Sequence, residues 1–325
     1  MRIPHKVASV FVSSLLFLAI LISGSQNNSP AQDLTEPTTA RGIQLYEQGN
    51  APEAIKLLKK IVEKHPDDAD AWYYLGLSLY REGLIGHAGP AFEKTVELRP
   101  NFSDARAKLA FALILGNQPQ RAIAMAQRAL ELGDQSPEAH YAIAEAELRA
   151  GEPAKAIEEA ENVLRINPSF ALALITKSFA QYSLQQLPDA AASLEKFLAI
   201  SPNDLDAETW REQLEELSNR TYQSSNLAAQ AFKGNEVSQK LRVISKPEPQ
   251  YSEAARHAGV TGTVVIRAIF SSEGEVKHIL VTRALGYGLT TQAVKAARRI
   301  KFQPAVKDGE PVSMYINLEY NFNLY

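Results

Sequence analysis

A 34-residue period governs the middle of this 325-residue chain and constrains its fold more than any other feature. When units of 34 residues are counted from Thr35, the twentieth position of every unit is alanine, without insertion or deletion. A fixed period of this length is typical of repeat proteins, in which each unit buries its apolar face against its neighbours. The middle of the chain is therefore predicted to form a solenoid. The five alanines are Ala54, Ala88, Ala122, Ala156 and Ala190.

Three other positions predict that each unit is a pair of helices. The eighth position holds only Gly, Ala or Ser, and small residues at two phases let two helix axes approach closely. The fifteenth position is mostly Gly or Asn, which accept the left-handed conformation that ends a helix. Proline at the thirty-second position of four units ends the second helix, because proline has no N–H group to continue it.

These units resemble the tetratricopeptide repeat. The second unit matches the signature of that family most fully, with Trp72, the pair Leu75-Gly76 and the closing Pro100 in the expected order. Five units occupy residues 35–204. A helix over 205–217, in which apolar residues recur at spacings of three and four, is expected to cover the last unit.

The resemblance implies a concave face, lined by the first helix of each unit, that holds a peptide or helix of a partner protein. Aromatic side chains occupy its inward positions, and aromatic residues are enriched where binding energy concentrates. The alternative is that these rings pack against the neighbouring unit. The groove residues predicted to bind a partner are Tyr46, Tyr73, Tyr80, Phe111, Tyr141, Phe179 and Tyr182.

Beyond a stretch rich in Ser, Asn and Gln at 218–236, interpreted as a linker, the apolar period changes from helical to alternating. Alternating runs over 263–270 and 276–282 predict a β-hairpin, and a third run over 312–322 predicts the last strand. The expected fold class is an α-solenoid of five helix pairs with a capping helix, followed by a small α+β domain over 237–325 that has a three-stranded antiparallel sheet and two helices.

Local signals mark the two helices of this second domain. The first is predicted to begin after Ser252 as its cap and to end at Gly259. The second is predicted over Leu289–Ile300, with Thr290 as its cap.

The second domain resembles the TonB C-terminal domain over about 80 residues, Lys246–Tyr325. In that family the domain lies in the periplasm and pairs its last strand with a short N-terminal segment of an outer-membrane transporter. The residues and short motifs that carry the resemblance are Pro249-Gln250-Tyr251, Ala255-Arg256, Gly259, Gly262, Gly274, Phe302-Gln303-Pro304-Ala305 and Gly309-Glu310-Pro311-Val312.

An open sheet edge agrees with this mode of binding, because its unpaired N–H and C=O groups can accept an added strand. Protection of the edge by the chain's own tail or by self-pairing is the alternative. The edge residues predicted to contact the partner are Tyr315, Ile316, Asn317, Leu318, Glu319, Tyr320 and Asn321, with Pro249, Gln250 and Tyr251 close by.

The N-terminal segment, residues 1–31, predicts export. Basic residues precede an uncharged and mostly apolar stretch, Val7–Ile22, whose sixteen residues lie between the lengths of a signal core and of a membrane span. A cleaved signal peptide and an uncleaved inner-membrane anchor both fit. The rest of the chain is expected in the periplasm, and the absence of cysteine excludes attachment by a lipidated cysteine.

The two halves of the chain differ in net charge. Residues 237–325 hold 12 Lys+Arg and 7 Asp+Glu, a net charge of +5, whereas residues 32–236 hold 20 and 30, a net charge of −10. Electrostatic attraction between the two halves would favour docking of the basic domain on the acidic repeats. Chance variation in surface charge is the simpler interpretation. The overall net charge of −3 argues against nucleic-acid binding.

No catalytic residue, metal site, cofactor or small-molecule substrate is predicted. The histidines lack metal-binding spacing, and Gly286-Tyr287-Gly288 lacks the remaining residues of a phosphate loop, so it is interpreted as a turn. Glu145 and Glu159 are expected on solvated helix faces. The expected function is non-enzymatic: an energy transducer of TonB type that contacts inner-membrane motor proteins, or a periplasmic adaptor that gathers envelope proteins.

Overall fold

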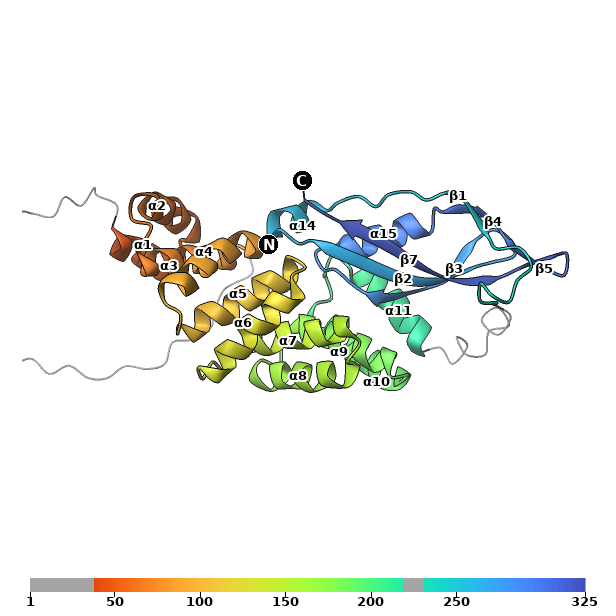
Figure 1. Cartoon of the computed structure of the whole chain (residues 1–325), viewed down its shortest axis with the longest axis horizontal. Helices are drawn as coiled ribbons and strands as arrows, with labels where there is room; N and C mark the ends of the chain where they lie inside the picture. The colour runs from red at the N-terminus through yellow and green to blue at the C-terminus, as the bar shows by residue number, and fades with distance from the viewer. Residues whose placement is uncertain (1–37, 219–230, 325) are drawn as a thin grey trace, which may run out of the picture. The chain divides into compact units, whose positions relative to one another are not determined.

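A computed structural model of the protein describes residues 38–218 and 231–324 (Figure 1). In the first of these ranges the helices of the repeats begin 34 residues apart, at 69, 103, 137 and 171 for the first helices and at 85, 119, 153 and 187 for the second. This spacing confirms the predicted repeat. The five pairs are α1 (Thr39–Glu47) and α2 (Ala51–Lys64), α3 (Ala69–Arg81) and α4 (Ile85–Leu98), α5 (Ser103–Leu115) and α6 (Pro119–Glu131), α7 (Pro137–Ala150) and α8 (Pro153–Ile166), and α9 (Ala171–Ser183) and α10 (Leu187–Ile200).

Small residues lie where the two helices of a unit cross. The five repeat alanines are fully buried. A Cβ atom added at Gly42 would lie 2.5 Å from Leu58 Cδ2, and one added at Gly76 would lie 2.6 Å from Phe92 Cε1, so a larger residue would push the helices apart. The residues at the fifteenth position all have positive φ, between 55° and 82°, as a left-handed helix end requires.

One further helix, α11 (Ala207–Ser218), follows the last pair. Trp210 on this helix is 2% exposed, and its ring centroid lies 5.8 Å from that of Phe179 and 6.5 Å from that of Phe197. The helix thus covers apolar side chains of the fifth unit.

The C-terminal domain has the predicted order of elements. The helix α14 (Glu253–Ala258) is followed by β2 (Gly262–Phe270), β3 (Val276–Arg283), α15 (Leu289–Ala297) and β7 (Met314–Phe322). The three long strands form one antiparallel sheet in the order β3-β2-β7. The Ser252 hydroxyl accepts a hydrogen bond from the Ala255 N–H, and Gly259 ends α14 in the left-handed conformation. The expected fold class is therefore confirmed.

Four short strands were not anticipated. The pairs are β1 (Arg242–Ser245) with β4 (Lys301–Gln303) and β5 (Ala305–Lys307) with β6 (Glu310–Val312). Strands of three or four residues are too short to show an alternating pattern, and every residue of β1 is exposed.

The end of the predicted linker belongs to the C-terminal domain. Phe232 forms a parallel bridge to Met314, because its N–H donates to the Ser313 carbonyl at 2.9 Å and its carbonyl accepts from the Tyr315 N–H at 3.1 Å. The rest of the linker, 219–230, and the predicted export segment, 1–31, lie outside the described residues.

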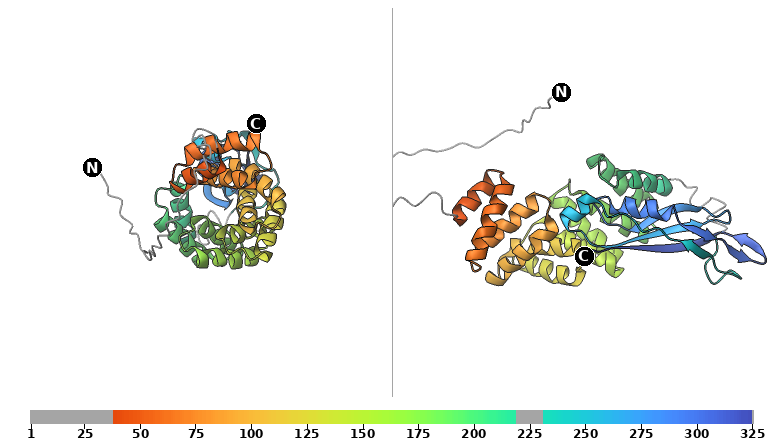
Figure 2. Two further views of the ribbon diagram at one scale, coloured as in Figure 1. Left: turned by 90° about the vertical axis from the view of Figure 1, so that its left-hand side faces the viewer. Right: turned by 90° about the horizontal axis from the view of Figure 1, so that it is seen from above.

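The repeats and the C-terminal domain belong to one compact unit, Pro37–Tyr325. A single hydrophobic cluster contains Leu174, Phe197 and Trp210 from the helical part together with Val260 and Leu289 from the C-terminal domain. Seen along the array, the repeat helices surround strands of that domain (Figure 2, left). The concave face of the repeats thus holds the chain's own C-terminal domain.

Candidate functional site: two sheet edges and a docked domain

The edge formed by β7 offers backbone groups to a partner. Met314, Leu318, Tyr320 and Phe322 are buried, whereas Asn317, Glu319 and Asn321 are exposed. The Tyr315 N–H and the Ser313 carbonyl point away from β2, because both bond to Phe232. Backbone groups alternate in direction along a strand, so the odd-numbered residues carry the outward groups.

This finding narrows the predicted set of edge residues. The backbone groups of Ile316, Leu318 and Tyr320 point toward β2, and only the odd-numbered residues can pair with an added strand. Within 38–218 and 231–324, the Asn317 N–H and carbonyl and the Glu319 N–H have no outward hydrogen-bond partner. The side chain of Asn321 accepts a hydrogen bond from the Thr263 hydroxyl at 2.6 Å.

The chain covers this edge at two places. Phe232 covers the beginning of β7, and the Lys246 ammonium donates to the Glu319 carbonyl at 2.8 Å. The same ammonium lies 4.7 Å from the ring centroid of Tyr320. The Tyr320 hydroxyl is buried and has no hydrogen-bond partner among the described residues, and burial raises the pKa of this group to about 12. The edge between the two covers, centred on Asn317, stays open.

Gln213 closes the opposite edge of the sheet. Its side-chain amide accepts a hydrogen bond from the Val281 N–H at 2.8 Å and donates one to the Val281 carbonyl at 3.2 Å. Helix α11, which carries Gln213, lies alongside the strands (Figure 2, right). The amide group occupies the place that the peptide group of an added strand would take. Of the two edges, β3 is therefore blocked at Val281, whereas β7 is open at Asn317.

Asp206 caps a helix of the other domain. Its carboxylate accepts from the Gly288 N–H at 2.9 Å and from the Thr291 N–H at 2.7 Å, and both groups belong to the first turn of α15. Burial raises the pKa of this carboxyl group to about 6, although the two N–H groups act in the opposite direction. The prediction that Thr290 caps α15 is wrong: its hydroxyl donates instead to the Leu285 carbonyl.

Backbone contacts bring the C-terminal domain against earlier repeats. The Thr261 N–H donates to the Leu115 carbonyl at 3.0 Å. A Cβ atom added at Gly86 of α4 would lie 2.9 Å from the carbonyl oxygens of both Ala258 and Gly259. Gly86 is therefore a contact point between α4 and α14.

Two ion pairs join the basic C-terminal domain to helix α11 of the acidic half. Arg298, which follows the last residue of α15, pairs with Glu212 at 2.6 Å, and Lys295 of α15 lies 3.8 Å from Glu208. Both carboxylates lie on α11 and are partly exposed, so each pair contributes at most about 1 kcal/mol. Apolar contacts and backbone hydrogen bonds therefore account for more of the docking than these ion pairs do.

The aromatic residues predicted to line the groove divide into two groups. The first group is at least 91% buried, as the alternative of packing within the protein predicts. It comprises Phe111, Tyr141, Phe179 and Tyr182. The second group is half-buried and comprises Tyr46, Tyr73 and Tyr80.

The half-buried tyrosines have partners within the array. The Tyr73 hydroxyl donates to Asp104 at 2.5 Å, and the Tyr80 hydroxyl donates to Glu138 at 3.1 Å. Lys108 joins the two carboxylates, at 2.7 Å from Glu138 and 3.8 Å from Asp104. Burial raises the pKa of both tyrosines. This network connects three consecutive repeats and leaves neither hydroxyl unpaired.

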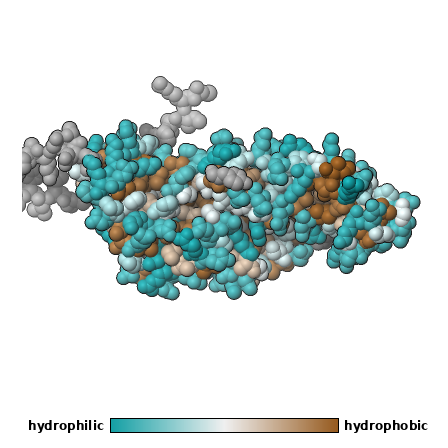
Figure 3. All heavy atoms as spheres, turned by 45° about the horizontal axis from the view of Figure 1, so that its top comes forward, coloured by the Kyte–Doolittle hydropathy of each residue, from teal (hydrophilic) through white to brown (hydrophobic). Residues whose placement is uncertain are grey.

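Of the residues predicted beside the first C-terminal helix, Tyr251 lies close to the end of β7. The Tyr251 hydroxyl bonds to the Val260 carbonyl, and the Tyr251 ring lies 5.7 Å from that of Phe322. Pro249 is half-buried and Gln250 is exposed. In β1, a few residues upstream, Val243 and Ile244 are 48% and 63% exposed. Figure 3 shows an apolar patch in this part of the surface.

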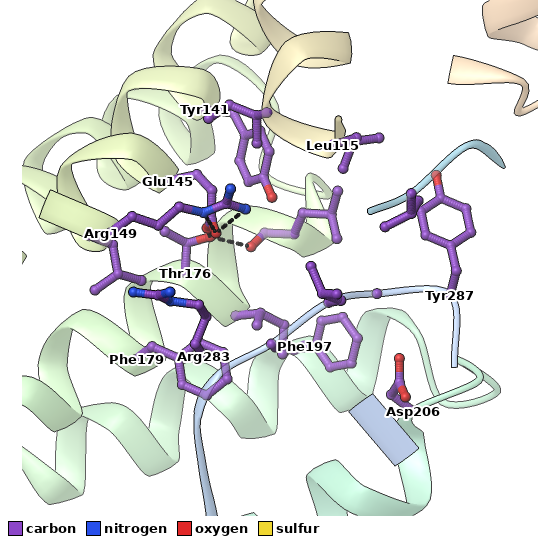
Figure 4. Close-up of a pocket in the computed structure, with 18 of the residues that line it drawn as sticks. Leu115, Tyr141, Glu145, Arg149, Thr176, Phe179, Phe197, Asp206, Arg283 and Tyr287 are labelled. Atoms are coloured by element: carbon purple, nitrogen blue, oxygen red, sulfur yellow. Dashed lines mark hydrogen bonds and ion pairs between the residues drawn. The ribbon is translucent and has the colours of Figure 1, made fainter. Parts of the chain in front are cut away.

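A pocket of about 140 Å³ lies between the repeats and the loop that joins β3 to α15 (Figure 4). One side carries Arg149 and Glu145, which form an ion pair at 3.0 Å, and Thr176, whose hydroxyl donates to Glu145 at 3.0 Å. Glu145 is only 9% exposed, so its predicted place on a solvated face is wrong. Arg283 lies on the same side, and Tyr287 and Asp206 lie on the other.

Sequence reasoning missed the docking residues Gln213, Asp206 and Gly86. Gln213 occupies a helix position that no motif distinguishes, and its partner is 68 residues away in the chain. Asp206 stands just before α11, where an acidic residue is expected as the cap of that helix. Gly86 is the one weak signal, since a glycine within a helix often marks a close approach.

Two kinds of site are absent from the described part of the chain. No group of three or more His, Asp or Glu side chains within 38–218 and 231–324 is arranged to hold a metal ion. In the same ranges no helix has the length and apolar character needed to span a bilayer.

Family models match both parts of the chain. The model described as Gram-negative bacterial TonB protein C-terminal matches residues 247–324. Two tetratricopeptide repeat models match residues 39–103 and 141–204, and residues 79–146. Among curated proteins, Protein TonB of Vibrio cholerae serotype O1 is 30% identical over 83 residues, which are 25% of this chain and 34% of that protein. The match thus spans about a third of the relative.

Solved structures also show similarity to about half of the chain. A crystal structure of MamA protein is 26% identical, with a TM-score of 0.40, and the match covers 51% of this chain and 90% of MamA. The crystal structure of YrrB, described as a TPR protein with an unusual peptide-binding site, is 21% identical, with a TM-score of 0.42 and coverage of 54% and 90%.

Proposed function

Because the chain joins tetratricopeptide repeats to a TonB C-terminal domain, we propose that it is a non-enzymatic cell-envelope protein that binds an extended segment of an outer-membrane transporter. The segment adds as a strand to β7. The repeats hold the domain from their concave face and leave this edge accessible. In the cell this binding serves energy-coupled transport across the outer membrane.

The observation that carries this proposal is the difference between the two sheet edges. Gln213 satisfies both backbone groups of Val281 on β3, whereas the outward groups of Asn317 have no partner among the described residues. A buried peptide group needs a partner, so strand addition is favoured where peptide groups are still free to pair. The β7 edge meets this condition.

A second candidate function is an adaptor that gathers periplasmic proteins without transmitting force. The observation that favours it is the docking of the domain on the repeats through Gln213, Asp206 and a shared apolar core. A domain fixed in this way suits the presentation of a binding edge at a constant position.

Strand addition can be tested with two substitutions at one residue. Asn317→Pro removes an outward N–H group and leaves the ladder to β2 intact, because that group does not bond to β2. Asn317→Ala keeps the N–H group and is the matched control. With a photo-crosslinking residue at Glu319, we expect capture of a partner in cells by the chain and by Asn317→Ala, and at least about tenfold less by Asn317→Pro.

The identity of the captured protein separates the two functions. Capture of the N-terminal segment of an outer-membrane transporter supports the transporter hypothesis, and capture of soluble periplasmic proteins supports the adaptor. Equal capture by Asn317→Pro and Asn317→Ala, with unchanged circular dichroism, would reject strand addition at β7 in both.

A further inference from the structure

The pocket between the repeats and the C-terminal domain has the composition of a ligand site. Ligand sites are concave and mostly apolar, carry a few convergent polar groups and are frequent between domains. Apolar walls come from both parts, with Ile175 and Phe179 from the repeats, Trp210 from α11, and Val260 and Leu285 from the C-terminal domain. The pocket of about 140 Å³ is close in size to an apolar cavity that holds benzene.

One wall of the pocket carries the exposed side chain of Arg283, a positive charge with no partner among the described residues. Arg149 is occupied, since it bonds to Glu145 at 3.0 Å and to the Asn117 side chain at 3.2 Å. Arg283 lies on the same side of the pocket (Figure 4), and its guanidinium group has no hydrogen bond or ion pair with any described residue. This wall therefore holds two guanidinium groups and one carboxylate.

The acidic groups elsewhere in the pocket are already engaged. Asp206 accepts two N–H groups at the beginning of α15, where the helix dipole also favours a negative charge. Asp204 accepts from the Asp206 N–H at 2.8 Å. Asp204 is exposed to solvent, and the buried Asp206 does not offer a free carboxylate to a cationic ligand. Arg283 is the lining cation without a partner among the described residues, and it favours an anionic occupant.

We propose that this pocket binds a small carboxylate whose apolar part lies against Phe179 and Trp210 and whose carboxylate pairs with Arg283. An aliphatic chain of about six carbons or a single aromatic ring matches the volume. Because both domains contribute walls, the ligand stabilises the docked arrangement of the C-terminal domain. This ligand is distinct from the protein segment proposed to bind at β7. It is not a substrate, because the chain binds it without transforming it.

The chain offers its own reporter for this site. It contains two tryptophans, Trp72 and Trp210, and Trp210 lines the pocket. In a Trp72→Phe background, the fluorescence of Trp210 would be followed while sodium hexanoate is added at constant ionic strength. 1-Hexanol serves as the uncharged probe. Arg283→Ala removes the proposed carboxylate partner, and Arg242→Ala, at an exposed residue of β1, is the matched control.

We expect a saturable change with hexanoate in the millimolar range, a rise in the unfolding midpoint, and binding about tenfold weaker for Arg283→Ala and for 1-hexanol. Arg242→Ala should bind as the unchanged chain does. A fluorescence change that does not saturate, or equal binding by Arg283→Ala and Arg242→Ala, would overturn the proposal. Neither result depends on β7, so the test is independent of the proposed function.

Discussion

The side-chain amide of Gln213 makes both hydrogen bonds that a neighbouring strand would make to Val281. The donor and acceptor distances are 3.2 and 2.8 Å, and Gln213 is 2% exposed. A helix of the repeat region thus takes the place of a strand at the β3 edge. This relationship explains how a three-stranded sheet with two edges presents only one of them to a partner.

Gln213→Ala should lower the free energy of unfolding by about 1–3 kcal/mol, because two buried backbone groups of Val281 lose their partner. It should also promote self-association through the exposed β3 edge. Denaturant unfolding and light scattering would measure both effects. Gln120→Ala, at an exposed residue of α6, is the control. A stability within about 0.5 kcal/mol of that control would contradict the role given to Gln213.

Asp206 should make the stability of the chain depend on pH. Burial raises its folded pKa to about 6, above the value of about 4 in an unfolded chain, so the folded state binds the proton more tightly. Stability from this group is therefore complete below about pH 4 and is lost as the pH rises through 6. Relative to Asp206→Asn, the chain should gain up to about 3 kcal/mol between pH 7 and pH 4.

Subtracting the pH dependence of the unfolding free energy of Asp206→Asn from that of the unchanged chain removes the contribution of other titrating groups. Glu159 is one of them, since its hydrogen bond to His140 lowers its pKa. Urea unfolding at several pH values would give the difference. A difference that is constant with pH would show that the pKa of Asp206 is the same in the folded and unfolded chain, because the two N–H groups offset the effect of burial.

Gly86→Ala should weaken docking while it strengthens the helix. Alanine is favoured over glycine within a helix by about 1 kcal/mol, but its Cβ atom would lie 2.9 Å from two carbonyl oxygens of the C-terminal domain. We expect hydrogen exchange of the Thr261 amide to become at least about tenfold faster, as its bond to Leu115 opens. Gly89→Ala, where the nearest contact is 3.6 Å, should leave this exchange unchanged.

Phe232→Pro should increase affinity for a partner that adds to β7. Proline removes the N–H group that bonds to Ser313, so less of the edge has to be uncovered before binding. Crosslinking yield from Glu319 should rise about threefold to tenfold, whereas Phe232→Ala, which keeps the N–H group, should give a smaller rise. A decrease with Phe232→Pro would mean that this residue helps to bind the partner.

Tyr320→Phe should leave the chain as stable as before or stabilise it by up to about 1 kcal/mol. The hydroxyl that it removes is buried without a partner among the described residues, and such a group costs free energy. Thermal unfolding would measure the change. A loss of more than about 1 kcal/mol would indicate that a bound water molecule pairs with the hydroxyl.

Local sequence signals predicted the elements of both parts well. The 34-residue period located all five helix pairs, and the positive φ values at Asn117 and Gln185 show that the fifteenth position ends a helix even without glycine. Ser252 and Gly259 marked the two ends of α14. These signals work because caps, turns and periodic burial are set by residues a few positions apart.

The candidate site was predicted only in part. Alternation in the last strand indicated which side chains face the core, but it did not show that Phe232 and Lys246 cover parts of the edge. The aromatic residues of the groove were recognised, but Phe111, Tyr141, Phe179 and Tyr182 are buried within the array and its docked domain. A sequence pattern does not distinguish a ring that faces a partner from one that faces the next repeat.

The sequence by itself determined the repeat, the order of helices and strands, and the family resemblance of each part. Only the tertiary structure decided that the concave face holds the chain's own C-terminal domain, that Asp206 caps a helix 82–85 residues away, and that Gln213 closes β3. The physical reason is the range of the interactions. Helix and strand formation depends on neighbours within a few residues, whereas docking depends on single side chains that meet across large separations in sequence, where no period or motif marks them.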